Sequence, residues 1–212
     1  YAVLATAVRH RPIVPPVVVA IGGEVATGKS TASKWISRRL GAPVVNTDRT
    51  REYLLGGKPD GAPHEVHWER AYHPGFGERV YTEVLRRGEA VLSSGRPVLL
   101  DGGFRSAAQR ARARELAGRF GLPFLVVEVR APRDEQKRRL RRRSERDGEP
   151  PSTWLGIADA LRREWEPPTE LAADERLVLD MNDRPRAIVA RVRERLPTWP
   201  EAWTGRGERD AR

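Results

Sequence analysis

A glycine-bounded loop that ends in lysine and serine separates an apolar run from a stretch with helical character. The loop reads Gly23-Glu24-Val25-Ala26-Thr27-Gly28-Lys29-Ser30, with Thr31 next, and matches every fixed position of G-x-x-x-x-G-K-[ST]. Glycines let the backbone curl so that successive N–H groups point at one anion, and the following helix adds its positive dipole end. Lys29 can reach the β- and γ-phosphates of a nucleotide, and the Ser30 hydroxyl can bind Mg²⁺. The motif predicts a site for ATP and Mg²⁺.

Two aspartates end apolar runs further along the chain. Asp101 closes Pro97-Val98-Leu99-Leu100-Asp101, the form of a Walker B acid that holds Mg²⁺ directly or through water. A cap for the next helix is the alternative. Asp48 follows a second short run, and Arg51 comes three residues later. Asp48 could take the proton from an acceptor hydroxyl and Arg51 could clamp an anionic acceptor, unless Asp48 only caps its own helix.

Apolar runs typical of strands alternate with helical stretches along the chain. Strands are expected at 17–21, 43–45, 97–101, 124–129 and 177–179, and helices at 32–40, 49–55, 76–93, 106–120, 132–146, 152–165 and 188–196. Ser152 is the expected N-cap of the helix at 152–165. This alternation predicts an α/β fold with a parallel sheet covered on both faces. Ligands of such sheets bind at the carboxyl ends of the strands, where the loop, Asp48, Asp101 and the segment near Arg130 would meet.

Composition bounds the class of protein without naming a partner. The 212 residues predict one domain at 17–196, with a helix and linker at 1–16 and a tail at 197–212 that contains Trp199 and Trp203. No cysteine occurs, no apolar run approaches a membrane span, and no secretory signal is evident. A cytoplasmic location without membrane partners is therefore expected. The net charge of +10 fits an anionic ligand, and ATP already qualifies as one.

The motifs together resemble a known group of enzymes. The order of Gly23-x4-Gly28-Lys29-Ser30-Thr31, Asp48-x-x-Arg51, Leu100-Asp101-Gly102-Gly103-Phe104 and an arginine-rich stretch is similar to P-loop kinases of the polynucleotide-kinase and zeta-toxin type. It resembles still more closely the small bacterial AAA-type ATP-binding domains, which are often fused behind a domain similar to aminoglycoside phosphotransferases. The resemblance implies a P-loop NTPase sandwich with strand order 2-3-1-4-5 and a mobile lid at about 138–152. Gly103-Phe104 stands where polynucleotide kinases carry a Thr-Asn pair.

The resemblance also assigns roles to arginines. It implies that Asp48 is the general base, that Arg51 and Arg105 bind the acceptor, and that Arg110 is a further site arginine or a scaffold arginine. The stretch 138–146 takes the place of a lid that closes over ATP and stabilises the transferring phosphate. Arg139 and Arg143 best match the family pattern R-L-x-x-R, and they lie on one helix face at i, i+4. Both are therefore predicted to contact ATP and to assist catalysis, whereas many neighbouring arginines would only face solvent.

A polar segment between 56 and 75 reads as a loop or flap. His64, His67 and His73 occur there without the spacing of a metal site. Trp68, Tyr72 and Phe76 could line an acceptor pocket or pack the segment down.

These observations predict an ATP- and Mg²⁺-dependent phosphotransferase that acts on a hydroxyl of a small polar acceptor. Two alternatives stay open. The acceptor could be the 5′-hydroxyl of a polynucleotide, or the domain could be a regulatory ATP-binding module of a larger protein with a fused or partner domain.

Overall fold

Five strands form one parallel sheet in the computed structural model, in the order β2-β3-β1-β4-β5. The strands are β1 (Val18–Gly22), β2 (Val44–Asn46), β3 (Val98–Asp101), β4 (Phe124–Arg130) and β5 (Arg176–Asp180), and every pair runs parallel. The structure describes residues 16–56, 71, 73–148, 150–181 and 185–196. This order and the helices on both faces confirm the predicted fold class, that of the P-loop NTPases.

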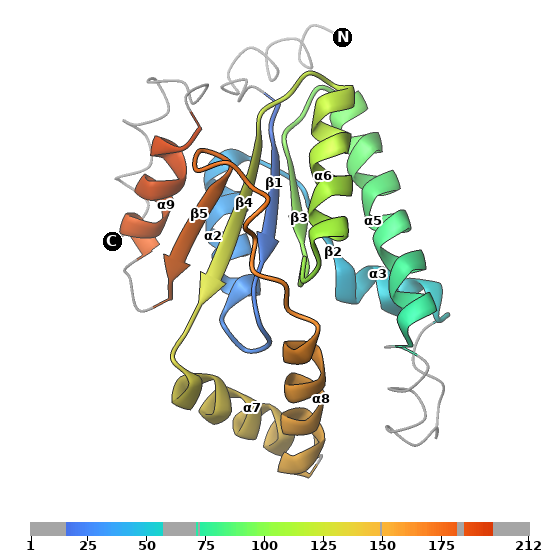
Figure 1. Cartoon of the computed structure of the whole chain (residues 1–212), viewed down its shortest axis with the longest axis vertical. Helices are drawn as coiled ribbons and strands as arrows, with labels where there is room; N and C mark the ends of the chain where they lie inside the picture. Colours follow the sequence, from blue (N-terminus) through green and yellow to red (C-terminus); the bar gives the residue numbers. More distant parts are fainter. Residues whose placement is uncertain (1–15, 57–70, 72, 149, 182–184, 197–212) are drawn as a thin grey trace, which may run out of the picture.

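Helices from the intervening segments cover both faces of the sheet (Figure 1). They are α2 (Lys29–Leu40), α3 (Thr47–Leu54), α5 (Pro74–Ser93), α6 (Ala107–Arg119), α7 (Arg133–Asp147), α8 (Pro151–Arg163) and α9 (Pro185–Glu194). Helices α2 and α9 bury Ile36 and Ile188 against Val19 and its neighbours on one face. Helices α5 and α6 bury their apolar sides against Val18 and Ala20 on the other. Because successive side chains of a strand point to opposite faces, a sheet covered twice needs continuous apolar runs such as β1.

Local signals set the helix ends around the site. Helix α2 ends at Gly41, whose φ of 61° is left-handed, and α6 begins with a capping box made by Ser106 and Gln109. The expectation that Ser152 caps the next helix is wrong. Helix α8 begins at Pro151 without a side-chain cap bond, because proline at the first helical position already has a helical φ and needs no N–H partner.

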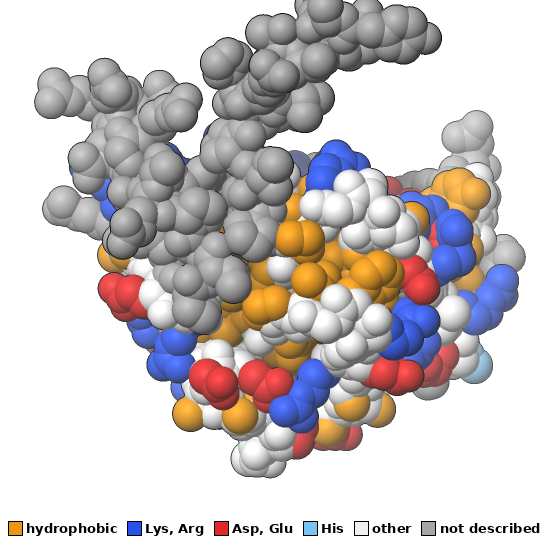
Figure 2. Space-filling model, turned by 90° about the horizontal axis from the view of Figure 1, so that it is seen from above, with side chains coloured by type: hydrophobic (Ala, Val, Ile, Leu, Met, Phe, Trp, Pro, Cys, Tyr) orange, Lys and Arg blue, Asp and Glu red, His pale blue; other side chains and the backbone are white. Residues whose placement is uncertain are grey.

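Helices α7 and α8 form a hairpin beyond the carboxyl ends of the strands (Figure 1). The hairpin has a small core of Leu140, Trp154 and Ala158, and Val25 and Ala26 of the phosphate loop pack against it. Figure 2 shows the opposite end of the molecule, where apolar side chains gather inside a charged rim. No described helix has both the length and the apolar character required to cross a membrane.

Candidate active site

A cavity of about 180 Å³ lies between the phosphate loop, the start of α3, the loop after β3 and the α7–α8 hairpin. Lys29 and Ser30 line one side, and Asp48, Arg51 and Asp101 line the others. The predicted phosphate, metal and acceptor groups thus meet in one space, as expected for the carboxyl edge of a parallel sheet.

The phosphate loop adopts a curled backbone that its sequence permits. Gly23 and Gly28 have φ values of 136° and 103°, which side chains rarely tolerate. A Cβ atom on Gly23 would also lie 2.4 Å from the carbonyl oxygen of Val129. Two side chains of the loop stabilise this conformation by hydrogen bonds to the Glu24 carbonyl oxygen. Lys29 Nζ donates to it at 2.5 Å and Thr27 Oγ1 donates to it at 3.0 Å.

Lys29 sits among charges of both signs. Burial lowers the pKa of Lys29 from 10.5 to about 8. The carboxylates of Asp101 and Asp48 oppose that decrease, and the guanidinium groups of Arg105 and Arg143 add to it. A triphosphate would add negative charge next to Lys29 and restore its proton affinity. The electrostatics therefore suit a lysine that receives an anion.

Asp101 and Ser30 are suitable ligands for Mg²⁺. Asp101 Oδ2 accepts a hydrogen bond from Asn46 Nδ2 at 3.0 Å, and burial raises the pKa of the Asp101 carboxyl. A cation would relieve the cost of burying that charge. No cluster of three His, Cys, Asp or Glu ligands occurs in the described part of the chain. Two oxygen ligands with phosphates and water fit Mg²⁺, which keeps several waters in such sites.

Asp48 is not the cap of its helix. The side chain of Asn46 accepts from Arg49 N at 2.9 Å and thus caps α3. The carboxylate of Asp48 instead pairs with Arg51 NH1 at 2.7 Å, and its side chain is 63% exposed. The buried Arg51 also donates from Nε to the Ala71 carbonyl at 3.0 Å. Arg51 therefore orients Asp48 in the cavity wall.

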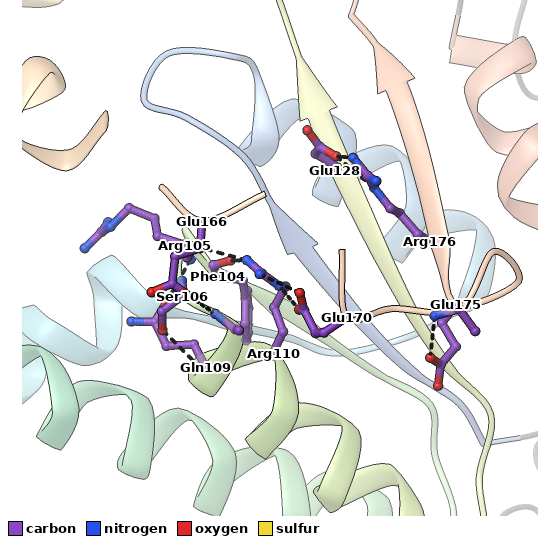
Figure 3. A network of polar contacts seen from close by, with 12 residues as sticks. Phe104, Arg105, Ser106, Gln109, Arg110, Glu128, Glu166, Glu170, Glu175 and Arg176 are labelled. Carbon is purple, nitrogen blue, oxygen red and sulfur yellow. Dashed lines mark hydrogen bonds and ion pairs between the residues drawn. The ribbon is translucent and has the colours of Figure 1, made fainter. Parts of the chain in front are cut away.

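Arg105 and Arg110 have different positions although they lie five residues apart. Arg105 lines the cavity, as predicted for an acceptor-binding residue. Arg110 is 1% exposed and does not line it. Its guanidinium binds Glu170 and the carbonyl oxygen of Phe104 (Figure 3). Of the two roles considered for Arg110, its burial and its contacts with Glu170 and the Phe104 carbonyl fit the scaffold role.

A chain of polar contacts ties the segment after α8 to the loop after β3. Glu164 pairs with Arg105 at 3.1 Å, and the Glu166 carboxylate accepts from Ala107 N at 2.6 Å. Further along, Glu170 pairs with Arg110 at 2.5 Å (Figure 3). The end of α8 is thus fixed to the acceptor side of the cavity.

The two predicted lid arginines occupy different places. Arg143 lines the cavity, with its guanidinium carbon 3.7 Å from the centre of a Trp154 ring. Arg139 does not line it and instead donates from NH1 to the Ala26 carbonyl at 3.1 Å. That position lies beside Gly28 and Met181, outside the lining of the cavity.

Several residues that line the cavity carry no motif in the sequence. Tyr81 of α5 and Trp154, Ile157 and Leu161 of α8 all line the cavity. No motif includes these residues, and their residue types on a helix are typical of core packing. The hydroxyl of tyrosine and the indole N–H of tryptophan give the only sequence signal, because such groups on an apolar helix face need a partner.

Part of the predicted flap lies outside the described residues, which excludes His64, His67, Trp68 and Tyr72. The same holds for the N-terminal segment up to residue 15 and for Trp199 and Trp203. Phe76 packs against the core cluster of α5 and α6 rather than in the cavity.

Comparison with known proteins agrees with this architecture. The model of the AAA domain family matches residues 18–168, which include the phosphate loop, Asp48, Asp101 and the hairpin. The chain belongs to the AAA domain family. Uncharacterized proteins of Mycobacterium tuberculosis and Mycobacterium bovis are 37% identical over 98 residues, which is 46% of this chain and 20% of theirs. The chain thus spans about a fifth of the length of these relatives.

Several solved structures share the fold of this chain. A candidate kinase of Chloroflexus aurantiacus has a TM-score of 0.65 at 22% identity, over 86% of this chain and 99% of that one. Kti12 of Chaetomium thermophilum, in complex with ADP-AlF3, has a TM-score of 0.61 at 16% identity, over 84% and 98%. The APS kinase CysC of Mycobacterium tuberculosis, with AMPPNP and APS, has a TM-score of 0.56 at 17% identity, over 85% and 97%. At these identities the likeness shows a shared fold, that of the P-loop NTPases.

Proposed function

We propose that this AAA-domain chain is an ATP- and Mg²⁺-dependent phosphotransferase that moves the γ-phosphate to a hydroxyl of a small polar acceptor. One observation carries the proposal: Lys29 of the phosphate loop and the carboxylate of Asp48 line one cavity, with Asp48 oriented by Arg51. A phosphate loop alone binds a nucleotide, whereas transfer to a hydroxyl also needs a base on the opposite side of the γ-phosphate.

Each residue has a defined task in this scheme. Lys29 and the loop N–H groups bind the β- and γ-phosphates, and Arg143 adds positive charge from the hairpin. Asp48 accepts the proton of the attacking hydroxyl, and Arg51 keeps its carboxylate turned toward the cavity. Ser30 and Asp101 would hold Mg²⁺, which neutralises charge on the phosphate oxygens.

Solved structures of the same fold favour a small acceptor over a polynucleotide end. Kinases among the solved structures of this fold include a gluconokinase and an APS kinase, whose named substrates are small molecules. The resemblance to the polynucleotide-kinase and zeta-toxin group suggests a polynucleotide 5′-hydroxyl as an alternative acceptor. We favour it less than a small molecule.

The test is transfer of ³²P from [γ-³²P]ATP to a panel of metabolites and 5′-hydroxyl oligonucleotides. Asp48→Asn should reduce transfer by at least about 10²-fold, the usual contribution of a general base, and leave AMPPNP affinity unchanged. Glu52→Gln is the matched control, because Glu52 lies on the same helix, is exposed and does not line the cavity.

Two results would contradict this function. If Asp48→Asn transfers phosphate as fast as the wild type, Asp48 is not the base. If the wild type hydrolyses ATP slowly, transfers phosphate to no acceptor and is insensitive to Asp48→Asn, the chain is better described as a nucleotide-operated module of a larger protein with a fused or partner domain.

A further inference from the structure

Two hydrogen-bond donors from different elements converge above Gly103. A Cβ atom on Gly103 would lie 3.0 Å from Arg105 NH1 and 3.6 Å from the hydroxyl oxygen of Tyr81. All three residues line the cavity. Because residue 103 has no side chain, one ligand oxygen near that point can be within hydrogen-bond distance of both donors.

The guanidinium of Arg105 is only partly used by the protein. Its Nε and NH2 both lie 3.1 Å from a single oxygen of Glu164. NH1 makes no hydrogen bond to any residue that the structure describes. The Arg105 side chain is 19% exposed, whereas that of Glu164 is 55% exposed. Glu164 therefore binds the Nε and NH2 groups of the Arg105 guanidinium, and NH1 faces the cavity. A guanidinium N–H in this position can bind an oxygen of a carboxylate or phosphate.

The hydroxyl of Tyr81 is also arranged as a donor. Its oxygen accepts a hydrogen bond from Phe104 N at 2.9 Å, which leaves the phenol proton for another partner. The ring of Tyr81 packs edge-on against Phe104, with ring centres 5.3 Å apart. Phe104 is buried and has a φ of 44°, a conformation that its surroundings must enforce. These two contacts with Phe104 fix the orientation of the Tyr81 ring and of its hydroxyl group.

The balance of charge in the cavity points to an anion. Arg51 is paired with Asp48, and Lys29 and Arg143 face the position of the triphosphate. Three acids line the same space, Glu24, Asp48 and Asp101, and Glu24 is paired with Arg162 outside it. Arg105 is the remaining lining cation, and its NH1 group is not used by its partner Glu164. An acceptor without negative charge would leave NH1 of Arg105 desolvated and unpaired, which costs free energy.

We infer that Arg105 and Tyr81 form an anion subsite and that the acceptor is a hydroxyl compound carrying a carboxylate or a phosphate group. The identity of the acceptor rests on the proposed function, whereas the subsite can be tested without it. In the reaction, the hydroxyl oxygen forms a bond to the γ-phosphorus and the bond to the β,γ-bridging oxygen breaks. The hydroxyl proton passes to Asp48, and the anionic group on the subsite is unchanged.

The experiment measures binding of sulfate to the full chain with Mg²⁺ and AMPPNP at saturation, so that the γ-phosphate position is filled. Wild-type protein should bind sulfate saturably. Arg105→Met should weaken that binding at least about tenfold and Tyr81→Phe about threefold, in line with loss of a charged and a neutral hydrogen bond. Arg105→Lys, which keeps the charge but loses the fork, should bind with intermediate affinity.

Arg112→Met is the matched control. Arg112 lies on α6, pairs with Glu78 at 2.8 Å and does not line the cavity, so its loss should leave sulfate binding unchanged. Thermal unfolding of each variant separates loss of the subsite from loss of fold. Displacement of sulfate by acetate or by inorganic phosphate then indicates which anion the acceptor carries.

The outcomes separate the subsite from the proposed function. Absence of saturable sulfate binding, or equal binding by Arg105→Met and wild type, overturns the subsite and leaves the phosphotransferase proposal standing. Failure of AMPPNP itself to bind overturns the phosphotransferase proposal. The subsite is then tested without nucleotide, where Arg105→Met should bind one sulfate fewer than the wild type.

Discussion

The sheet body and the α7–α8 hairpin are stabilised to very different degrees. The body buries sixteen residues in the apolar cluster on one face of the sheet and fifteen in the cluster on the other. The hairpin buries three, and it completes its core with Val25 and Ala26 of the phosphate loop. Because burial of apolar area dominates folding free energy, the hairpin depends on the body for its stability and the body does not depend on the hairpin.

This difference separates two groups of functional residues. Asp48, Asp101, Tyr81 and Arg105 lie on the body and are preformed before any ligand binds. Arg143 lies on the hairpin, so its contribution depends on how the hairpin packs. The comparison predicts that acceptor recognition is rigid and that closure around the nucleotide is adjustable.

Two buried leucines test the comparison most strongly. Leu99 of β3 is 0% exposed and Leu140 of α7 is 2% exposed. Leu99→Ala should lower the free energy of unfolding by about 3–4 kcal/mol, the usual cost of such a cavity. Leu140→Ala should lower it by less than about 1 kcal/mol, since a local unit can open separately. Urea unfolding measures both, and hydrogen exchange should show faster exchange of α7 and α8 amides in Leu140→Ala. Equal losses for the two variants would mean that body and hairpin unfold as one unit.

The pH dependence of nucleotide binding tests whether Arg143 of the hairpin influences Lys29 of the sheet body. Lys29 belongs to the body, has a pKa of about 8 in the free protein, and is influenced by Arg143 of the hairpin. A bound triphosphate raises that pKa, so binding takes up a proton above pH 8 and none well below it. The association constant for AMPPNP should fall by up to about tenfold per pH unit above 8, about 1.4 kcal/mol.

Calorimetry in buffers of different ionisation enthalpy measures this proton uptake directly. Arg143→Met should shift the onset to higher pH, because Arg143 helps to lower the pKa of Lys29. Lys29→Ala should abolish the dependence. An onset that does not move in Arg143→Met would show that the hairpin does not act on Lys29.

The smallest expected effect belongs to an ion pair that connects the two regions. Glu24 of the phosphate loop binds Arg162 of α8 at 3.0 Å, with side chains 26% and 24% exposed. Arg162 also pairs with Asp159 at 2.6 Å. A double-mutant cycle on Glu24→Gln and Arg162→Met should give a coupling energy of about 0.2–1 kcal/mol, as for other exposed pairs. A coupling above that range would make this pair a main attachment of the hairpin.

Sequence patterns predicted the architecture well because its causes are local. The continuous apolar runs, the alternation with helices and the pattern from Gly23 to Ser30 each follow from short-range rules, and they predicted the parallel α/β class. The strand order was predicted only from the resemblance to P-loop kinases. The placement of Asp48 and Asp101 at strand ends followed from the short-range rules.

The roles of the arginines could not be read from the chain. Arg105 and Arg110 are the same residue type in neighbouring positions, and the sequence around them does not distinguish their roles. Their roles differ because the segment 164–170 lies beside them, where Glu164 pairs with Arg105 and Glu170 pairs with Arg110. The place of Tyr81 in the cavity could not be predicted, because its position in the helical apolar repeat is typical of a core residue. These properties depend on contacts between residues far apart in sequence, which no local pattern encodes.

The attachment of the hairpin at two ends limits how it can move. One end joins β4 directly through Ala131 and Pro132, and the other is held where Glu164 and Glu166 contact the loop after β3. Between these ends the hairpin also contacts the phosphate loop, through the Glu24–Arg162 pair and the hydrogen bond from Arg139 to the Ala26 carbonyl. Opening of the hairpin would therefore have to break both contacts, whereas Arg105 would keep its place beside the end of α8.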